Sequence, residues 1–412
     1  MKPAAQMLSL SPATTGAASV NTQTPERAIA YWLLLCCGMI FAMVVIGGIT
    51  RLTLSGLSIT EWQPVTGILP PLSHAAWTAE FEKYQAIPQY RQLNFGMTLA
   101  EFKSIYFWEY LHRLWGRLIG FAYALPLIWF VARRQVPRRL IWPLSGIFLL
   151  GFAQGALGWY MVESGLADRV EVSQYRLVAH LVLALAIYAV TLWIVLGILV
   201  RAKIPSSPFR AEREGPIAQR WEGEVGAGDR SGTPHLTPTL SAPQRTKAGG
   251  EGVLVGAGWR RAAEAIIALV ALTIAAGGFV AGLKAGLTYN TFPLMDGSFV
   301  PAGYARLHPF LLNWFENIPA VQFNHRLLAE TTVALVALLW LAGRRAVLPR
   351  RAALALHALA AMASLQFALG VSTLLLVVPI AVAALHQAGA VLLLTVAIVF
   401  RHALRPADPK PS

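Results

Sequence analysis

Long apolar runs separated by short charged segments dominate this chain. An α-helix needs about 20 predominantly apolar residues to cross the hydrocarbon core of a bilayer. Runs of that kind occur at 28–50, 105–131, 138–162, 174–200, 260–283, 319–342, 347–375 and 379–400. The pattern therefore predicts an all-α integral membrane protein with eight transmembrane helices. Composition agrees, because only 13% of the residues are charged, against about 25% in soluble domains.

The arginines are concentrated in the connections that follow the even-numbered runs, for example Arg133, Arg134, Arg344 and Arg345. Such clusters are typical of cytoplasmic loops. We therefore expect a multi-pass protein with both termini in the cytoplasm. The net charge of +14 then reflects membrane topology, and it indicates a lipid bilayer as the partner and no nucleic acid. The arginine-poor N-terminus favours a bacterial inner (cell) membrane, although the sequence leaves a mitochondrial membrane open.

Composition divides the chain into five segments. We expect a cytoplasmic polar tail (1–27), an N-terminal four-helix bundle (28–200), a cytoplasmic disordered linker (201–259), a C-terminal four-helix bundle (260–400) and a cytoplasmic tail (401–412). The linker is rich in Gly, Pro, Ser and Thr, which cannot bury a core. The aromatic outer loop 51–104 predicts a partly helical cap. The adjacent Cys36 and Cys37 are poor disulfide partners, so they are interpreted as helix-packing residues.

The two bundles repeat each other in sequence. GGITRLTLSGLS at 47–58 matches GGFVAGLKAGLT at 277–288, a shift of 230, and QGALG at 154–158 matches QFALG at 366–370. His-Arg-Leu occurs at 112–114 and again at 325–327, a shift of 213. Both halves begin on the same side of the membrane, so the pattern predicts two pseudo-symmetric bundles related by an axis along the membrane normal.

Four histidines occupy matched positions in this repeat. Each lies about five to seven residues into an even-numbered run, which places all four roughly 8–10 Å below the outer surface; they are His112, His180, His325 and His386. Two histidines per half at one depth are typical of haem ligated by two imidazoles in a helical bundle. The alternative is that the four histidines are packing residues held by hydrogen bonds. A closed zinc site is less suitable, because it needs four converging ligands.

At these motifs the chain resembles a known family. GGITRLTLSGLSITEW at 47–62, the stretch 94–120 with its EYLHR, and the second His-Arg pair resemble the haem A synthases, closest to their cysteine-poor proteobacterial and mitochondrial branch. The resemblance implies an oxidoreductase for cytochrome oxidase biogenesis, which oxidises a pyrrole methyl of haem O to a formyl with oxygen from water. It also implies haem O as substrate in the N-terminal half, a resident haem b in the C-terminal half and an external electron acceptor.

The residues themselves distinguish the two halves. Glu109 lies three residues before His112, on the same helix face, and the shift of 213 makes Gln322 its equivalent. A carboxylate near only one haem predicts chemistry there, with Glu109 accepting a proton or stabilising positive charge. An ordinary hydrogen bond at headgroup level is the alternative. Arg113 and Arg326, and more weakly Arg51, are candidate ligands for haem propionates, with snorkelling towards headgroups as the competing interpretation.

The paired glycines Gly47–Gly48 and Gly277–Gly278 predict close approach of a helix or of the macrocycle, with simple small-residue packing as an equal alternative. Arg117 and its equivalent Glu330 lie near mid-membrane, where an unpaired charge is costly, so we expect each to have a partner. Their pairing across the interface between the halves is one hypothesis.

Two other functions remain open at this stage: a cytochrome b-type electron carrier and a transporter. Haem O synthase, oxidase assembly factors and further copies of the chain are candidate partners.

Overall fold

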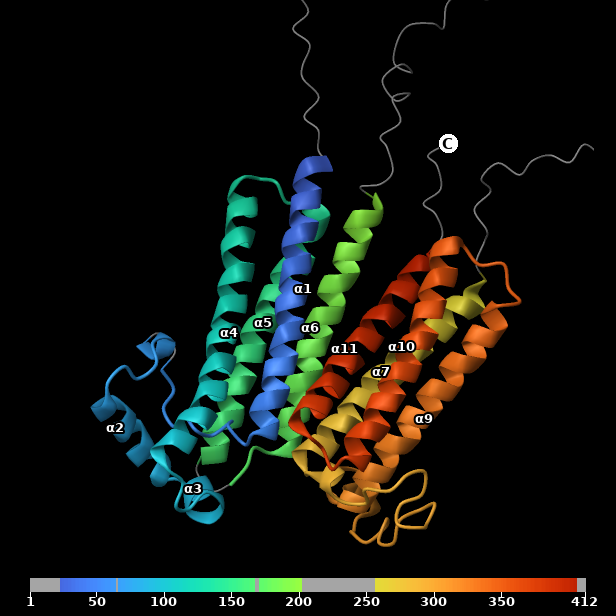
Figure 1. The fold of residues 1–412 in the computed structure, drawn as a ribbon. Helices are drawn as coiled ribbons and strands as arrows, with labels where there is room; N and C mark the ends of the chain where they lie inside the picture. The colour runs from blue at the N-terminus through green and yellow to red at the C-terminus, as the bar shows by residue number, and fades with distance from the viewer. Residues whose placement is uncertain (1–22, 64–65, 167–169, 202–255, 406–412) are drawn as a thin grey trace, which may run out of the picture.

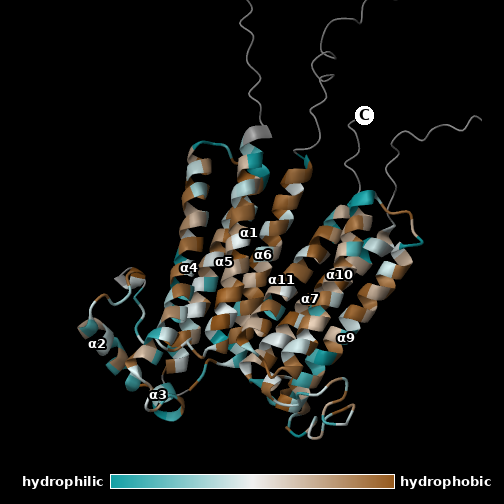
Figure 2. Cartoon of the chain, in the orientation of Figure 1, coloured by the Kyte–Doolittle hydropathy of each residue, from teal (hydrophilic) through white to brown (hydrophobic). Residues whose placement is uncertain are grey.

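The computed structural model describes residues 23–63, 66–166, 170–201 and 256–405. Within these residues there are helices and connecting loops but no β-strand. The predicted linker 201–259 and both predicted tails lie largely outside the described residues. Eight helices in the described part are long and apolar enough to cross a membrane, which confirms the predicted fold class. Figure 2 shows that these helices consist mostly of hydrophobic residues, whereas polar residues are more frequent towards the helix ends and in the loops.

The N-terminal bundle is a ring of four long helices, in which α1 packs on α4 and α6, and α5 packs on α6. Its members are α1 (Gln23–Leu52), α4 (Leu99–Ala132), α5 (Arg138–Leu166) and α6 (Gln174–Arg201). The C-terminal bundle has the same arrangement and consists of α7 (Ala257–Gly282), α9 (Ile318–Gly343), α10 (Arg350–Leu375) and α11 (Ile380–Ala403).

The interface between the halves is formed by α1, α6, α7 and α11. α1 packs on α11 as its equivalent α7 packs on α6, which is the pattern that a twofold pseudo-axis produces. The Gln387 amide donates to the Val44 carbonyl (2.9 Å), and the hydroxyls of Tyr188 and Thr395 lie 2.8 Å apart. In Figure 1, α1 and α7 begin at the same end of the molecule, and α6 and α11 end there.

A cap of short elements covers the opposite end of the N-terminal bundle (Figure 1). It contains η1 (Thr66–Ile68), α2 (His74–Gln85) and α3 (Pro88–Leu93). Tyr84 from α2 and Phe102 from α4 are both fully buried, and their rings pack at a tilt with centroids 5.2 Å apart, within an aromatic cluster. The corresponding end of the other bundle holds η3 (Ala285–Leu287), η4 (Phe310–Leu312) and α8 (Asn313–Glu316).

Helix α4 begins six residues before the predicted position 105, for a local reason. Thr98 accepts from the Glu101 backbone N–H, and the Glu101 carboxylate accepts from the Thr98 backbone, so the helix starts with a reciprocal capping box. The added turn packs Phe102 against the cap. Hydropathy alone missed this turn, because it contains the charged residues Glu101 and Lys103, and only Phe102 in it is buried.

Cys36 and Cys37 are buried and free within α1, as the sequence predicted. The thiol of Cys36 lies 3.9 Å from the Ala122 carbonyl of α4. Cys36 therefore serves the packing of α1 against α4.

Candidate functional site

Each of the four histidines packs against a glycine of the preceding long helix in its own bundle. A Cβ atom added to Gly158, Gly277 or Gly370 would lie 3.0, 3.0 or 2.9 Å from Cε1 of His180, His325 or His386. At Gly47 the corresponding distance to His112 Cε1 is 3.5 Å. Real side chains rarely tolerate the shorter distances, so the glycines set the position of the imidazole rings. Gly47 and Gly277 thus permit the close approach that the sequence predicted.

The second glycine of each pair contacts the other half of the molecule. A Cβ on Gly48 would overlap the side chain of Gln387 from α11, and a Cβ on Gly278 would lie 2.9 Å from Val178 of α6. Adjacent helix residues point about 100° apart. One glycine of each pair therefore seats a histidine, while the other brings the two bundles into contact.

Two glutamines anchor the histidine-bearing helices. Gln154 of α5 donates to the His180 backbone carbonyl (3.0 Å), and Gln366 of α10 donates to the His386 carbonyl (2.9 Å). Both glutamines begin the repeated QGALG and QFALG segments, and Gly158 and Gly370 end them. Sequence analysis used these segments only as evidence of a repeat. Both segments lie on the helix that directly precedes the fourth span of each half. This repeated position was the sequence signal that could have indicated a role next to His180 and His386.

The arrangement of the histidines fits haem. His180 is close enough to His112 to act on it electrostatically, and His386 acts in the same way on His325. No group of three or more His, Cys, Asp or Glu side chains that could hold a metal occurs among the described residues. Each half therefore offers a pair of imidazoles, and a porphyrin supplies the other four nitrogen ligands of its iron.

Glu109 is almost fully buried and makes four hydrogen bonds. One carboxylate oxygen accepts from the Ser58 hydroxyl and the Ile59 backbone N–H (both 2.8 Å). The other accepts from the Arg113 guanidinium, with Nη2 at 2.6 Å and Nε at 3.1 Å. Arg113 also donates to the carbonyls of Ile59 (2.8 Å) and Glu61 (3.0 Å). The pair thus fastens the first outer loop to α4, about one turn from His112.

The corresponding residues of the second half also connect their helix to the loop before it, but the hydrogen bonds of Gln322 to this loop run in the opposite direction. Arg326 donates to the carbonyls of Tyr289 (2.5 Å) and Thr291 (2.8 Å), which correspond to Ile59 and Glu61 by the shift of 230. Gln322, however, donates to the carbonyls of Ala285 (2.8 Å) and Thr288 (2.6 Å). Propionate binding by Arg113 and Arg326 stays a prediction, and a propionate would share these guanidinium groups with the loop carbonyls.

Arg51 lies at the junction of the two halves. Its guanidinium donates to Glu171 (2.7 Å) and to the Gly282 carbonyl of α7 (3.0 Å). Glu171, in the connection between α5 and α6, also forms an ion pair with Lys284 after α7. These contacts connect both bundles at their outer end. Propionate binding by Arg51 likewise stays a prediction.

The hypothesis that Arg117 pairs with Glu330 across the interface is wrong. α4 and α9 lie on opposite flanks of the molecule in Figure 1, because α1, α6, α7 and α11 occupy the interface. Arg117 donates to the Gln63 carbonyl (2.8 Å) of the first outer loop. Glu330 instead acts electrostatically on Arg326, one turn away on its own helix. Each charge therefore interacts within its own half.

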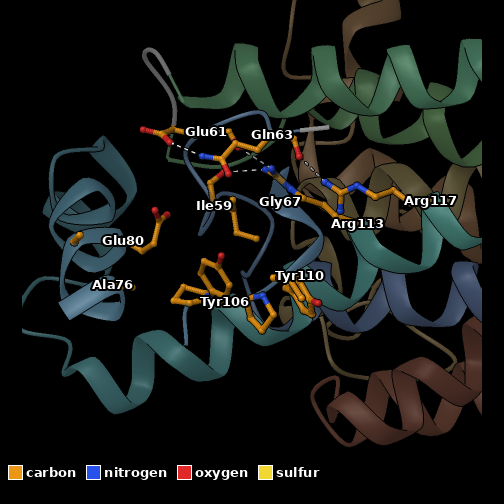
Figure 3. A pocket seen from close by; sticks show the side chains of 14 residues that line it. Ile59, Glu61, Gln63, Gly67, Ala76, Glu80, Tyr106, Tyr110, Arg113 and Arg117 are labelled. Atoms are coloured by element: carbon orange, nitrogen blue, oxygen red, sulfur yellow. Dashed lines mark hydrogen bonds between the residues drawn. The ribbon is translucent and has the colours of Figure 1, made fainter. Parts of the chain in front are cut away.

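A cavity of about 320 Å³ lies on the outer flank of α4. Its lining includes Tyr106, Tyr110, Arg113 and Arg117, which share one face of α4, together with the outer loop and α2 (Figure 3). That face is turned more than 100° from His112 on the helix. The cavity is therefore separate from the histidine pair and lies outside the four-helix ring.

Fold and site together define a membrane-embedded protein of two four-helix bundles, each with a histidine pair suited to haem. The model of the family COX15-CtaA, described as cytochrome oxidase assembly protein, matches residues 30–221 and 240–398. Heme A synthase of Nitrosospira multiformis is 47% identical over 92% of this chain and 94% of its own length. Heme A synthase of Rhodospirillum centenum is 46% identical over 97% and 94%. Heme A synthase COX15 of Mus musculus is 40% identical over 95% and 85%. The chain belongs to the haem A synthase family, as its motifs predicted.

Proposed function

We propose that this protein is a haem A synthase, which oxidises a pyrrole methyl of haem O to the formyl group of haem A. The supporting observation is the repeated histidine–glycine pair in each bundle, and the relatives that cover most of the chain are named heme A synthases. The conversion of a methyl and one water into a formyl releases four electrons and four protons. An electron acceptor outside the described chain must take up the electrons.

The substrate haem O is assigned to His112 and His180, and a resident haem b to His325 and His386. Glu109 supports this assignment, because it introduces a carboxylate near the first pair, whereas Gln322 is uncharged. Its buried oxygens already accept four hydrogen bonds. A fixed carboxylate is suited to stabilise positive charge that develops on the substrate as the methyl is oxidised.

The resident haem b would supply one-electron chemistry next to the substrate site when it is bound. The residues of this chain hold and separate the two sites. The packed interface of α1, α6, α7 and α11 keeps both histidine pairs in one rigid assembly. The proposed membrane is the bacterial inner membrane, with both termini in the cytoplasm. Arginines at the α4–α5 and α9–α10 turns support this orientation, since these turns lie at the same end of the molecule as the start of α1 and the end of α11 (Figure 1).

Alanine variants of the histidines test the assignment of the two sites. We expect His325→Ala and His386→Ala to remove the resident haem, because each deletes an axial ligand. His112→Ala and His180→Ala should spare that haem and stop the conversion of haem O. Haem content is measured by absorbance of the purified proteins, and conversion by chromatography of extracted haems. Loss of the same haem in all four variants would contradict the assignment.

A further inference from the structure

The cavity on the outer flank of α4 is formed by the first outer loop, α2 and α4. Arg117 donates to the Gln63 carbonyl (2.8 Å), and the Tyr110 hydroxyl donates to the Ile68 carbonyl (2.7 Å). These two bonds hold the loop against α4, while α2 contributes Glu80 to the lining (Figure 3). The volume of about 320 Å³ lies within the range of about 300–1,000 Å³ that is typical of small-molecule sites.

One end of this cavity is acidic. Glu80 of α2 and Glu61 of the outer loop lie there (Figure 3). Lys83 forms ion pairs with both, at 2.9 Å from Glu80 and 3.0 Å from Glu61. Its hydrogen bond holds the pKa of Glu61 below the usual 4.5, so this carboxyl is ionised at neutral pH. Two carboxylates beside one ammonium leave one net negative charge, which favours a cationic group of a ligand.

The opposite end of the cavity is basic. Arg113 and Arg117 lie four residues apart on one face of α4 and point into this end (Figure 3). Glu109 pairs with Arg113 at 2.6 Å and offsets its charge, and Arg113 also donates to the carbonyls of Ile59 and Glu61. Arg117 therefore supplies one net positive charge. A guanidinium is well suited to bind a phosphate.

The arginine-bearing face of α4 continues as an exposed apolar surface. Phe121, Ile128 and Val131 follow Arg117 at helical spacing and are 56%, 64% and 51% exposed. On a transmembrane helix such a surface contacts lipid chains. Leu69, which lines the cavity, is 70% exposed as well. A ligand with acyl chains would cover this surface, whereas a free phosphate compound would leave it bare.

We propose that the cavity binds the headgroup of a zwitterionic phospholipid with a primary ammonium, such as phosphatidylethanolamine. Its phosphate is placed at Arg117 and its ammonium at Glu80 and Glu61, so that one charge of each sign meets its counterpart. Phosphatidylglycerol has no cationic group for the acidic end. The quaternary ammonium of phosphatidylcholine has no N–H donor for the carboxylates.

The proposed site belongs to the N-terminal half alone. The shift of 213 places Phe323 and Glu330 where the first half has Tyr110 and Arg117. An acid at the position of Arg117 would repel a phosphate. We therefore expect one such lipid per chain.

Native mass spectrometry of the purified, delipidated protein measures the binding of the three phospholipids with identical acyl chains. We expect one phosphatidylethanolamine to bind about tenfold more tightly than phosphatidylglycerol or phosphatidylcholine, since each of these loses charge-assisted hydrogen bonds. Soluble O-phosphoethanolamine should compete only weakly, because it lacks the chains. Equal binding of the three lipids would overturn the proposal, and displacement of the lipid by equimolar O-phosphoethanolamine would overturn its assignment to a lipid.

Two variants test the ends of the cavity separately. Glu80→Gln should weaken phosphatidylethanolamine about tenfold and leave phosphatidylglycerol unchanged, whereas Arg117→Gln should weaken both lipids. Glu82→Gln on α2 and Arg91→Gln on α3 are matched controls at exposed positions and should bind lipid as the unchanged protein does. A preference that survives in Glu80→Gln would contradict the proposal. If Arg117→Gln does not fold, Glu80→Gln and the comparison of the three lipids still decide.

Discussion

Glu109 and Gln322 occupy equivalent positions and both accept from the arginine four residues later, but their hydrogen bonds to the loops run in opposite directions. The carboxylate accepts from a loop hydroxyl and a loop N–H, whereas the amide donates to two loop carbonyls. Both residues are 2% exposed, so neither bond set is replaced by water. The sequence predicted this asymmetry of charge. It did not predict the loop contacts, because the partners of Glu109 lie about 50 residues earlier in the chain.

Replacement of Glu109 by Gln tests whether its charge serves the chemistry. We expect Glu109→Gln to keep its resident haem but to convert haem O about 10²-fold more slowly or not at all, since the stabilising charge is gone. Chromatography of extracted haems measures conversion. Ser58→Ala is the control: it removes one hydrogen bond and keeps the charge, so conversion should stay within about tenfold. Conversion by Glu109→Gln at the unchanged rate would place the catalytic group elsewhere.

The glycines beside the histidines lead to a second prediction at this scale. In Gly370→Ala the new Cβ would lie 2.9 Å from His386 Cε1, so the ring must move. Overpacking of this kind costs about 1–3 kcal/mol, and a displaced ligand should lower haem affinity about tenfold or more. The haem-to-protein ratio after purification measures the effect. Gly38→Ala is the control, because no atom lies within 4 Å of its added Cβ. Equal haem content in both variants would contradict the proposal that Gly370 sets the position of the His386 ring.

At the scale of elements, hydropathy predicted the eight long helices but not which of them form the interface between the two halves. All eight runs are apolar, and lipid-facing and protein-facing sides are alike in composition. The assignment of helices to the interface therefore depended on small residues and polar contacts that only the structure reveals. Gly48 and Gly278 were identified from sequence, but their partners on α11 and α6 were not. The hypothesis that Arg117 pairs with Glu330 was wrong for the same reason.

Glu171, in the connection between α5 and α6, links the two halves through its ion pairs with Arg51 and Lys284. Burial opposes ionisation of Glu171, but Lys284 and Arg51 outweigh it and hold the pKa of this carboxyl below its usual 4.5. A depressed pKa means that the ionised form stabilises the fold above the unfolded-state pKa. That contribution is lost as the pH falls through the folded-state value.

We therefore expect Glu171→Gln to melt a few degrees below the unchanged protein at neutral pH, a loss of about 1 kcal/mol. The difference should shrink as the pH is lowered below the usual carboxyl pKa of 4.5, because the carboxyl of the unchanged protein becomes protonated in that range. Thermal melting in detergent at several pH values measures it. Glu163→Gln, at an exposed position on α5, is the control and should have little effect. A deficit for Glu171→Gln that is independent of pH would refute the ion-pair explanation.

At the scale of the whole molecule, the twofold repeat accounts for most of what the sequence could predict. Four histidines at one depth and two shifted copies of each motif indicated two similar bundles and two haem sites. The packing of the histidine rings against Gly158 and Gly370 could not be predicted, because it depends on helix rotation. The linker between the bundles lies outside the described residues, so its expected disorder stays a prediction.

The conversion of haem O is the measurement that tests the central claim most directly. The chain is produced in membranes that contain haem O but no other source of haem A, and the haems are extracted and separated by chromatography. The account predicts that haem A appears with the unchanged protein and is absent with His112→Ala. Purified protein that is folded and contains haem, but leaves haem O unchanged in such membranes, would contradict the proposed function.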